Sequence, residues 1–247
     1  MSATLTRHFA IQTAHSDVFG HCKAEALQGF MQIAATDHST ALGVSREDKV
    51  LGDGVFWVLS RMIYRLEQPV LYKTEIDVTT WHRGAQGPYF VRDFLIEQEG
   101  AEIGWGTSQW ILYSRESGKI LRPEVLGEDM THPPKVRDVP VEILKLKVPE
   151  SLAPLPPHHV VYSDLDYNHH VNNVKYTGFI ADCIHRDAAP LYLRTLQINF
   201  KHEALLGDKV GHELGETPEG WLYLRGTIEG RLCYEALAET APCQSLY

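Results

Sequence analysis

Two distant stretches of this chain carry the same side chains at matching intervals, and this repeat constrains the fold more than any other feature. A displacement of 149 residues superimposes four pairs: Asp17 on Asp166, His21 on His170, Gly29 on Gly178 and Phe30 on Phe179. A second displacement, of 136 residues, superimposes Tyr64-Arg-Leu-Glu67 on Phe200-Lys-His-Glu203. Self-similarity at a fixed spacing is typical of duplicated structural units. The chain is therefore expected to fold as two copies of one unit.

Each copy has the pattern of one helix followed by several strands. In the first copy, apolar residues at positions 24, 27, 31, 34 and 35 have helical spacing, and Gly43 is expected to end that helix. Runs rich in β-branched and aromatic residues follow at 55–64, 75–82, 89–97 and 103–114. The second copy has a short strand ending near Tyr162, a helix at 171–186, and strands at 193–200, 209–215, 221–229 and 232–240. This order predicts an α+β fold in which an antiparallel sheet buries one apolar helix.

The composition excludes several classes of protein. The 247 residues are 44% hydrophobic and 22% charged, as in ordinary globular proteins, and no segment is apolar enough to cross a membrane. The first residues form no apolar signal-peptide core, so we expect a cytoplasmic protein. A formal net charge of −9 argues against nucleic-acid binding. Candidates for a local basic patch that binds an acidic carrier are Arg61, Arg65, Lys73, Arg83 and Arg92, with scattered solvated charges as the alternative.

A group of polar residues stands directly before the second helix. Asp166, Asn168 and His170 occupy every second position, so in an extended segment their side chains would lie on one side. Asn172 or Asn173 is expected to cap the helix, which would direct backbone N–H groups towards the same volume. A carboxylate, an amide, an imidazole and a helix N-terminus together favour hydrolysis of an acyl bond.

Other interpretations of these residues stay open. An ordinary capping turn explains the spacing of the polar residues equally well. Glu203, expected just after a strand, is a candidate second carboxylate whose reach depends on the sheet register. No metal-ligand pattern is present, Ser163 lies in no G-x-S-x-G elbow, and Cys183 is expected to pack on the apolar stripe of its helix. Phe19 stands in the first copy where Asn168 stands in the second, so the first copy is expected to bind rather than to catalyse.

The stretch from Tyr162 to Phe179, YSDLDYNHHVNNVKYTGF, closely resembles the signature of the acyl-acyl carrier protein thioesterases of plant plastids and bacteria. The tandem repeat, the helix lengths and the chain length also resemble that family, so the likeness covers most of the chain. It implies a tandem double hotdog, each copy a long helix wrapped by an antiparallel β-sheet. The implied domains are an N-terminal hotdog at 1–130 that binds the acyl chain, a Pro-rich linker at 131–157 and a catalytic C-terminal hotdog at 158–247.

The resemblance also implies a site and a reaction. The family's proposed catalytic Asp, Asn, His and Glu correspond to four residues here: Asp166, Asn168, His170 and Glu203. They would hydrolyse fatty acyl thioesters of acyl carrier protein by direct attack of water, without a metal or an organic cofactor. Two positions depart from the plant pattern. Ala204 stands where a Cys is common, which weakens a cysteine-nucleophile mechanism, and Gly178-Phe179 replaces Gly-Trp.

Two alternative functions remain from the sequence. The chain could be a thioesterase for acyl-CoA or polyketide intermediates, or a hotdog module that binds acyl groups without cleaving them. The acyl chain length is not encoded in any motif, because the pocket depends on side chains that converge from both copies. The oligomeric state is also open, with a homodimer among the alternatives. No plastid transit peptide is recognisable in the sequence, so in this respect the chain resembles a bacterial member of the family or a mature form.

Overall fold

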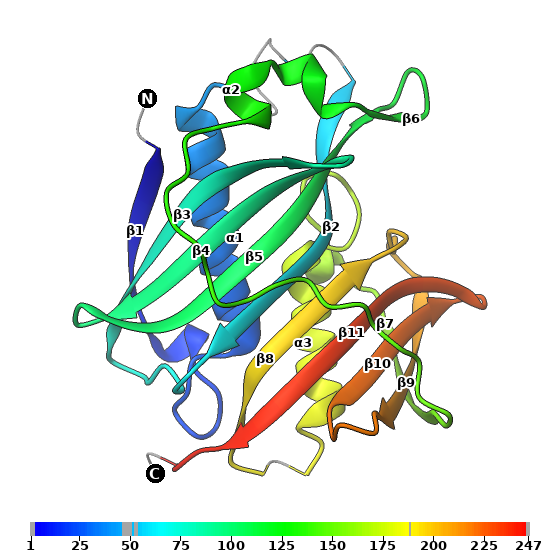
Figure 1. Ribbon diagram of the computed structural model, residues 1–247. Coiled ribbons are helices and arrows are strands. Elements are labelled where there is room, and N and C mark those ends of the chain that lie inside the picture. Colours follow the sequence, from blue (N-terminus) through cyan, green and yellow to red (C-terminus); the bar gives the residue numbers. More distant parts are fainter. Residues whose placement is uncertain (1–2, 46–50, 52–53, 188, 246–247) are drawn as a thin grey trace. The chain divides into compact units, whose positions relative to one another are not determined.

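The computed structural model describes residues 3–45, 51, 54–187 and 189–245, and it contains the expected duplication (Figure 1). The first copy comprises β1 (Thr4–Ala10), the 3₁₀ turn η1 (Thr13–His15), α1 (Ala24–Ala41), β2 (Val55–Leu66), β3 (Glu75–Gln86), β4 (Tyr89–Gln98), β5 (Ala101–Ser114) and β6 (Lys119–Leu121). The second comprises β7 (Ala153–His159), the 3₁₀ turn η4 (Tyr162–Asp164), α3 (Asn173–Ile184), β8 (Leu191–Phe200), β9 (Lys209–Glu216), β10 (Leu222–Ile228) and β11 (Arg231–Pro242). Between them lie η3 (Pro123–Leu126) and α2 (Glu128–Thr131).

The two copies arrange their strands in the same spatial order. The first copy has the order β1-β3-β4-β5-β2, and the second has the equivalent order β7-β9-β10-β11-β8. Every pairing with a recorded register is antiparallel, and β6 extends the first sheet as a hairpin with β5. In each copy the helix connects the edge strand to the strand at the other side of the sheet. The predicted α+β class is confirmed.

The predicted helices and strands are all present, with ends that differ by a few residues. Helix α1 ends at Ala41, and Gly43 follows it with a φ of 69°, a left-handed conformation that glycine adopts at little cost. Two strands were not predicted, β1 and β6. Strand β1 is an edge strand that exposes most of its side chains, so it lacks the alternation of a half-buried strand. Strand β7 begins at Ala153, inside the range 131–157 that we expected to be a linker.

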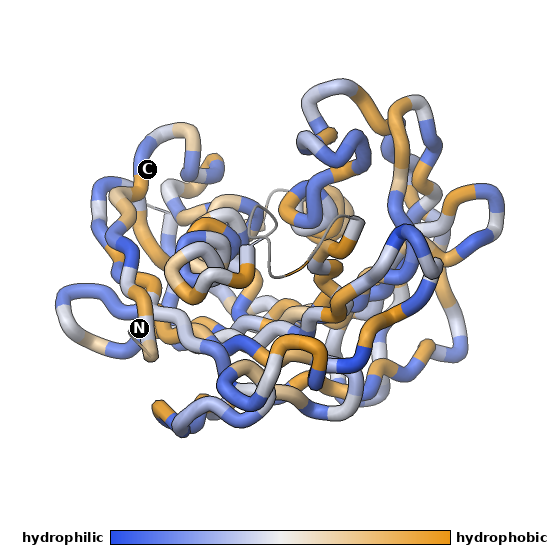
Figure 2. The backbone as a smooth tube through the Cα atoms, turned by 90° about the horizontal axis from the view of Figure 1, so that it is seen from above, coloured by the Kyte–Doolittle hydropathy of each residue, from blue (hydrophilic) through white to orange (hydrophobic). Residues whose placement is uncertain are grey.

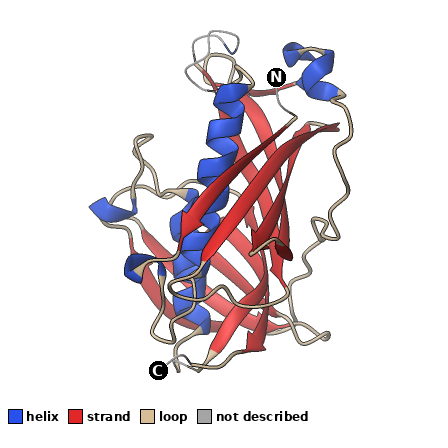
Figure 3. Cartoon of the chain, turned by 90° about the vertical axis from the view of Figure 1, so that its left-hand side faces the viewer, coloured by secondary structure: helices blue, strands red, loops and turns tan. Residues whose placement is uncertain are grey.

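Each helix packs on the sheet of its own copy (Figures 2 and 3). In the first copy the Phe30 ring of α1 stacks on Phe9 of β1 with ring centroids 4.4 Å apart. In the second copy the Tyr176 ring of α3 meets Phe200 and Tyr234 edge-on, at 5.7 and 5.5 Å. Aromatic pairs at such distances stabilise a core beyond the apolar area that they bury. The helices are thereby fixed on their sheets.

The chain divides into two compact units whose borders differ from the borders of the copies. Unit 1 consists of Met1–Ala10, Gly29–Tyr64 and Thr74–Ile143, and unit 2 of Ile11–Gln28, Arg65–Lys73 and Leu144–Tyr247. Unit 2 therefore contains the turn after β1 and the start of α1 as well as the whole second copy. Both of the polar turns that the repeat identified lie in this one unit. The domain boundaries inferred from the sequence stay a prediction.

Candidate active site

The residues from Asp166 to His170 form a tight turn, which was one of the two conformations compatible with the sequence, and not an extended segment. An isolated bridge between Leu165 and Val171 closes its base, and the Asp166 N–H donates to the His170 carbonyl at 3.0 Å. The Asn168 N–H donates to Asp166 Oδ1 at 2.7 Å. Alternation along a strand is therefore not what brings Asp166 and His170 together. They converge because the turn folds back on itself.

The two ionisable side chains of this turn lie close together and within reach of solvent. His170 Nδ1 is 3.9 Å from Asp166 Oδ1, and the side chains are 30% and 16% exposed. The Asn168 side chain, between them in sequence, is half-buried. A carboxylate and an imidazole at this distance can orient one water molecule or exchange a proton through it.

Helix α3 starts directly after the turn, and its first residues are ordered by a cap. Asn172 is the N-cap, as predicted: its Oδ1 accepts the Val174 N–H at 3.0 Å. The Asn172 N–H in turn donates to the Asp164 carbonyl at 2.9 Å. The N-terminal end of a helix carries a partial positive charge. This end lies immediately beyond His170 in the chain.

Glu203 comes to the turn through the loop that joins β8 to β9. The Val171 N–H donates to the Ala204 carbonyl at 2.9 Å, and His170 forms an isolated bridge with Leu205. The backbone beside Glu203 is thus bonded to the backbone of the turn, and the role of the Glu203 carboxylate in the site stays a prediction. The Glu203 side chain is exposed. Burial, followed by the neighbouring Cys233 and only then by the charge of Glu203, raises the pKa of the Tyr176 hydroxyl beneath the loop.

The first copy has the same turn with different surroundings. The Asp17 N–H donates to the His21 carbonyl at 2.8 Å, and Asp17 Oδ1 accepts the Phe19 N–H at 2.9 Å, as in the second copy. His21, however, is only 1% exposed. Its Nε2 lies 2.8 Å from the Gln244 carbonyl and its Nδ1 lies 3.3 Å from Cys243 Sγ. Residues near the C-terminus therefore occupy both nitrogens of this ring.

The structure corrects the second displacement of the repeat. The loop after β2 meets the first turn through a bridge of His21 with Leu71, and the equivalent bridge joins His170 to Leu205. Leu205 follows Leu71 by 134 residues, so the displacement is 134 and not 136. Glu203 then corresponds to Pro69, and the match with Glu67 was coincidental. The candidate carboxylate has no counterpart in the first copy.

Cys183 is buried on α3, and burial raises the pKa of its thiol to about 11, so the thiol is neutral near pH 7. This agrees with the expected packing role. Ser163 is exposed in η4. In the described part of the chain, no group of three or more His, Cys, Asp and Glu side chains is placed to hold a metal ion.

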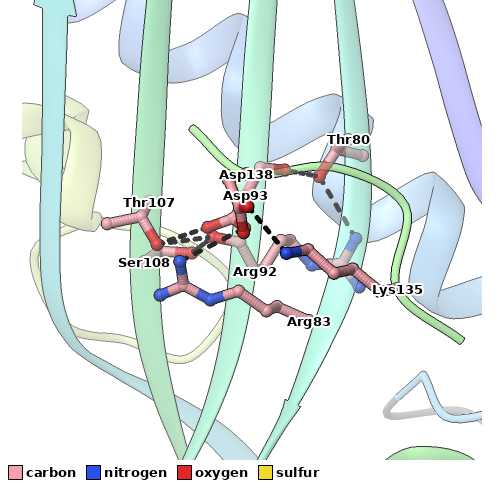
Figure 4. Close-up of polar contacts among 8 residues, drawn as sticks. All are labelled: Thr80, Arg83, Arg92, Asp93, Thr107, Ser108, Lys135 and Asp138. Atoms are coloured by element: carbon pink, nitrogen blue, oxygen red, sulfur yellow. Dashed lines mark hydrogen bonds and ion pairs between the residues drawn. The ribbon is translucent and has the colours of Figure 1, made fainter. Parts of the chain in front are cut away.

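Two of the cations proposed for a carrier-binding patch serve inside unit 1 instead (Figure 4). Arg92 is 6% exposed, and its guanidinium donates to His38 Nδ1 at 2.8 Å and to Thr80 Oγ1 at 3.3 Å. Arg83 lies 3.5 Å from the fully buried Asp93 carboxylate. The two arginines lie on opposite faces of the sheet. Side chains of consecutive strand residues alternate between the faces, so Arg92 points to one face and Asp93, the partner of Arg83, to the other. Arg92 is therefore not available for a surface patch, whereas Arg83 is partly exposed and paired with Asp93.

Two family models match the chain. The model of the acyl-ACP thioesterase N-terminal domain matches residues 2–128, which is just over half of the chain, and the model of the C-terminal domain matches residues 154–223. The second range includes the whole turn and the loop of Glu203. No helix in the described ranges combines the length and the apolar character needed to span a bilayer.

Relatives and solved structures agree with this match. A chloroplastic palmitoyl-acyl carrier protein thioesterase of Cuphea hookeriana is 24% identical over 71% of this chain and 46% of its own length. Oleoyl-acyl carrier protein thioesterase 2 of Arabidopsis thaliana is 26% identical over 78% of this chain and 58% of its own length. This chain thus spans about half the length of the curated relatives.

Among solved structures, an acyl-ACP thioesterase of Bacteroides thetaiotaomicron superposes with a TM-score of 0.86 at 21% identity, covering 98% of this chain and 100% of that one. The 12:0-ACP thioesterase of Umbellularia californica superposes with a TM-score of 0.80 at 20% identity, covering 98% and 99%. The predicted tandem hotdog fold is confirmed by these likenesses, which at such identities concern the fold alone.

Proposed function

Because this chain belongs to the acyl-ACP thioesterase family, we propose that it hydrolyses a fatty acyl thioester of acyl carrier protein to free fatty acid and carrier protein. One observation carries the proposal. Asp166 and His170 face each other at 3.9 Å in a solvent-accessible turn that leads directly into the N-terminus of α3. The copy with this open turn is also the copy that has Asn168. In the other copy the equivalent His21 is buried, and its ring is bonded to the Gln244 carbonyl.

The proposed reaction is direct attack of water on the thioester. The carboxylates of Asp166 and Glu203 orient the water and accept its proton, and His170 and Asn168 hold the water and the carbonyl group in place. Water oxygen bonds to the carbonyl carbon, the carbon–sulfur bond breaks, and the proton passes to the departing thiolate. Backbone N–H groups at the start of α3 stabilise the negative charge that develops on the carbonyl oxygen. No covalent intermediate, metal or organic cofactor takes part.

The remaining parts of the proposal concern the substrate and the copy that binds its acyl chain. The first copy binds the acyl chain, a role supported by its turn, in which Phe19 replaces the Asn and the C-terminal segment closes on His21. Palmitoyl- and oleoyl-acyl carrier protein thioesterases among the relatives support a fatty acyl substrate. The oligomeric state and a location in the cytoplasm stay predictions.

The proposal is tested by replacing the facing pair. Asp166→Asn and His170→Ala should each lower kcat on a fatty acyl carrier protein by about a hundredfold to ten-thousandfold, the range typical of a lost general acid–base group. The assay measures thiol release. The matched control is His169→Asn, an exposed neighbour whose φ of 67° an Asn tolerates. Wild-type turnover in both site variants would remove these residues from the mechanism.

Two alternative functions predict different results. A thioesterase for acyl-CoA or a polyketide would favour the CoA or polyketide form over the carrier-protein form when both carry one acyl group in competition. A non-catalytic acyl-binding module would bind the thioester tightly and release no thiol from it. The first result would change the substrate and keep the site, whereas the second would overturn the proposed reaction.

A further inference from the structure

A pair formed by a half-buried histidine and a buried aspartate lies beside the turn and has no part in the mechanism above. His158, near the end of β7, places its Nε2 2.8 Å from Asp164 Oδ2. The Asp164 side chain is 8% exposed and the His158 side chain 30%. The His158 ring also stacks on Phe179 of α3, with ring centroids 3.9 Å apart and planes inclined by 28°. The imidazole is therefore held on one face by packing and at one edge by a carboxylate.

Asp164 connects the pair to the base of the turn. Its Oδ2 accepts a hydrogen bond from the Val161 N–H at 2.9 Å and is also the oxygen that contacts His158 Nε2. Its backbone carbonyl accepts the N–H of Asn172, the cap of α3, at 2.9 Å. The next residue, Leu165, forms the bridge that closes the turn. The Asp164 side chain thus joins β7 to the 3₁₀ turn η4, and its backbone carbonyl joins this turn to the start of α3, next to the segment that presents the candidate catalytic residues.

The first copy supplies an internal comparison. At a displacement of 149 residues, Phe9 stands for His158 and His15 stands for Asp164. Phe9 stacks on Phe30 just as His158 stacks on Phe179, and the Gln12 N–H donates to His15 Nδ1 at 3.2 Å. Ring stacking is therefore formed without a His at the first position, and the local cap without an Asp at the second. The phenyl ring of Phe9 has no hydrogen-bond donor. The hydrogen bond between the stacked ring and the capping side chain, His158 to Asp164, is therefore found only in the second copy.

We propose that the His158–Asp164 pair positions the turn that carries Asp166, Asn168 and His170, and thereby sets the rate of the chemical step. A hydrogen bond to a carboxylate is stronger and shorter than one between neutral groups, so it limits the movement of the turn more tightly than stacking alone. Small displacements of reacting groups lower the rate steeply, while substrate contacts elsewhere are unchanged. The inference rests on the proposed function. His158 and Asp164 act as positioning residues that do not touch the substrate.

The decisive variant is His158→Phe, which installs the residue of the first copy, keeps the stack on Phe179 and removes the donor. We expect kcat to fall by about tenfold to a hundredfold with KM within about twofold of wild type. Asp164→Asn should lower kcat to a similar degree, because its amide still accepts the Val161 N–H but carries no charge. The double variant should lose no more than the stronger single variant, since both changes remove one interaction. His158→Gln, which restores a donor, should recover part of kcat.

The control is His159→Phe, the same substitution at the exposed neighbouring position of β7. It should leave kcat and KM unchanged. Wild-type kcat in His158→Phe, or additive losses in the double variant, would overturn the positioning role. If His158→Phe does not fold, Asp164→Asn and His158→Gln decide the question by the same split of kcat and KM. Failure of the wild-type protein to release any thiol would instead refute the proposed function, so the two failures are distinguishable.

Discussion

At the scale of single residues, two buried histidines are held in their neutral form. His82 on β3 is 7% exposed and His212 on β9 is 4% exposed. Burial lowers the pKa of each to about 4, from an ordinary value of 6.5. His212 Nδ1 lies 2.9 Å from the Tyr234 hydroxyl, which fixes the ring in the core beneath α3. Both residues make the fold sensitive to acid.

The free energy of unfolding should therefore fall as the pH is lowered from about 6.5 to about 4. In this window the unfolded chain takes up a proton on each of these histidines while the folded chain does not, and below about 4 the loss levels off. Each pKa unit corresponds to about 1.4 kcal/mol, so His212 contributes a loss of up to about 3 kcal/mol. His212→Gln, which keeps an acceptor for Tyr234, should flatten the profile measured by urea denaturation. The control is His169→Asn at an exposed position, which should keep the wild-type pH dependence of the free energy of unfolding. If His212→Gln keeps it as well, His212 is not a source of the acid sensitivity.

At the scale of elements, the support of α3 depends on a glycine in the neighbouring sheet. Gly226 of β10 lies opposite Tyr234 of β11, next to a register shift between Gly226 and Thr227. A Cβ added at Gly226 would collide with the Tyr234 ring, which is fully buried. That ring in turn meets Tyr176 of α3 at 5.5 Å. Gly226, which has no side chain, thus leaves room for the Tyr234 ring on which α3 packs.

Gly226→Ala should accordingly lower the free energy of unfolding by about 1–3 kcal/mol, the usual cost of overpacking a core. Its matched control is Gly211→Ala on the adjacent strand β9, where the nearest atom to an added Cβ is 3.7 Å away. Ordinary contact at that distance makes the control neutral within about 0.5 kcal/mol. Thermal or denaturant unfolding of both variants measures the difference. Equal stabilities would show that Tyr234 moves aside at no cost.

At the scale of the whole molecule, the two copies of the repeat have kept one fold and diverged in chemistry. Both have the same strand order and a turn closed by the same backbone bonds. They differ in what surrounds the turn. In the second copy His170 is 30% exposed, whereas in the first His21 is closed in by Gln244 and Cys243. The loss of the middle Asn at Phe19 is thus only one of the differences between the copies.

Restoring that Asn should therefore not create a second site. In an Asp166→Asn background, Phe19→Asn is expected to leave thiol release at the level of Asp166→Asn alone, because both His21 nitrogens remain occupied. Circular dichroism of the double variant checks that it folds. Turnover clearly above that of Asp166→Asn would mean that the Asn alone separates the active copy from the inactive one.

The sequence predicted most of the fold because period and composition are local properties of the chain. The helical spacing at 24–35 gave α1, and the runs of β-branched and aromatic residues gave the long strands. Strands β1 and β6 were missed because edge and hairpin strands bury little and carry no clear alternation. The site motif was found through the repeat and the long resemblance. Its shape stayed open between an extended segment and a turn, since local alternation does not reveal that backbone bonds close Asp166–His170 into a turn.

Local patterns along the chain were enough to establish the duplication, the α+β class, the family resemblance and the residues from which a site can be built. Tertiary structure alone decided how they are used. It fixed the displacement at 134 by pairing Leu205 with His170, it buried Arg92 that we had placed on the surface, and it joined His158 to Asp164. The difference lies in the range of the interactions. Periodicity acts over a few residues, whereas register, burial and hydrogen-bond partners depend on segments that meet only when the chain is folded.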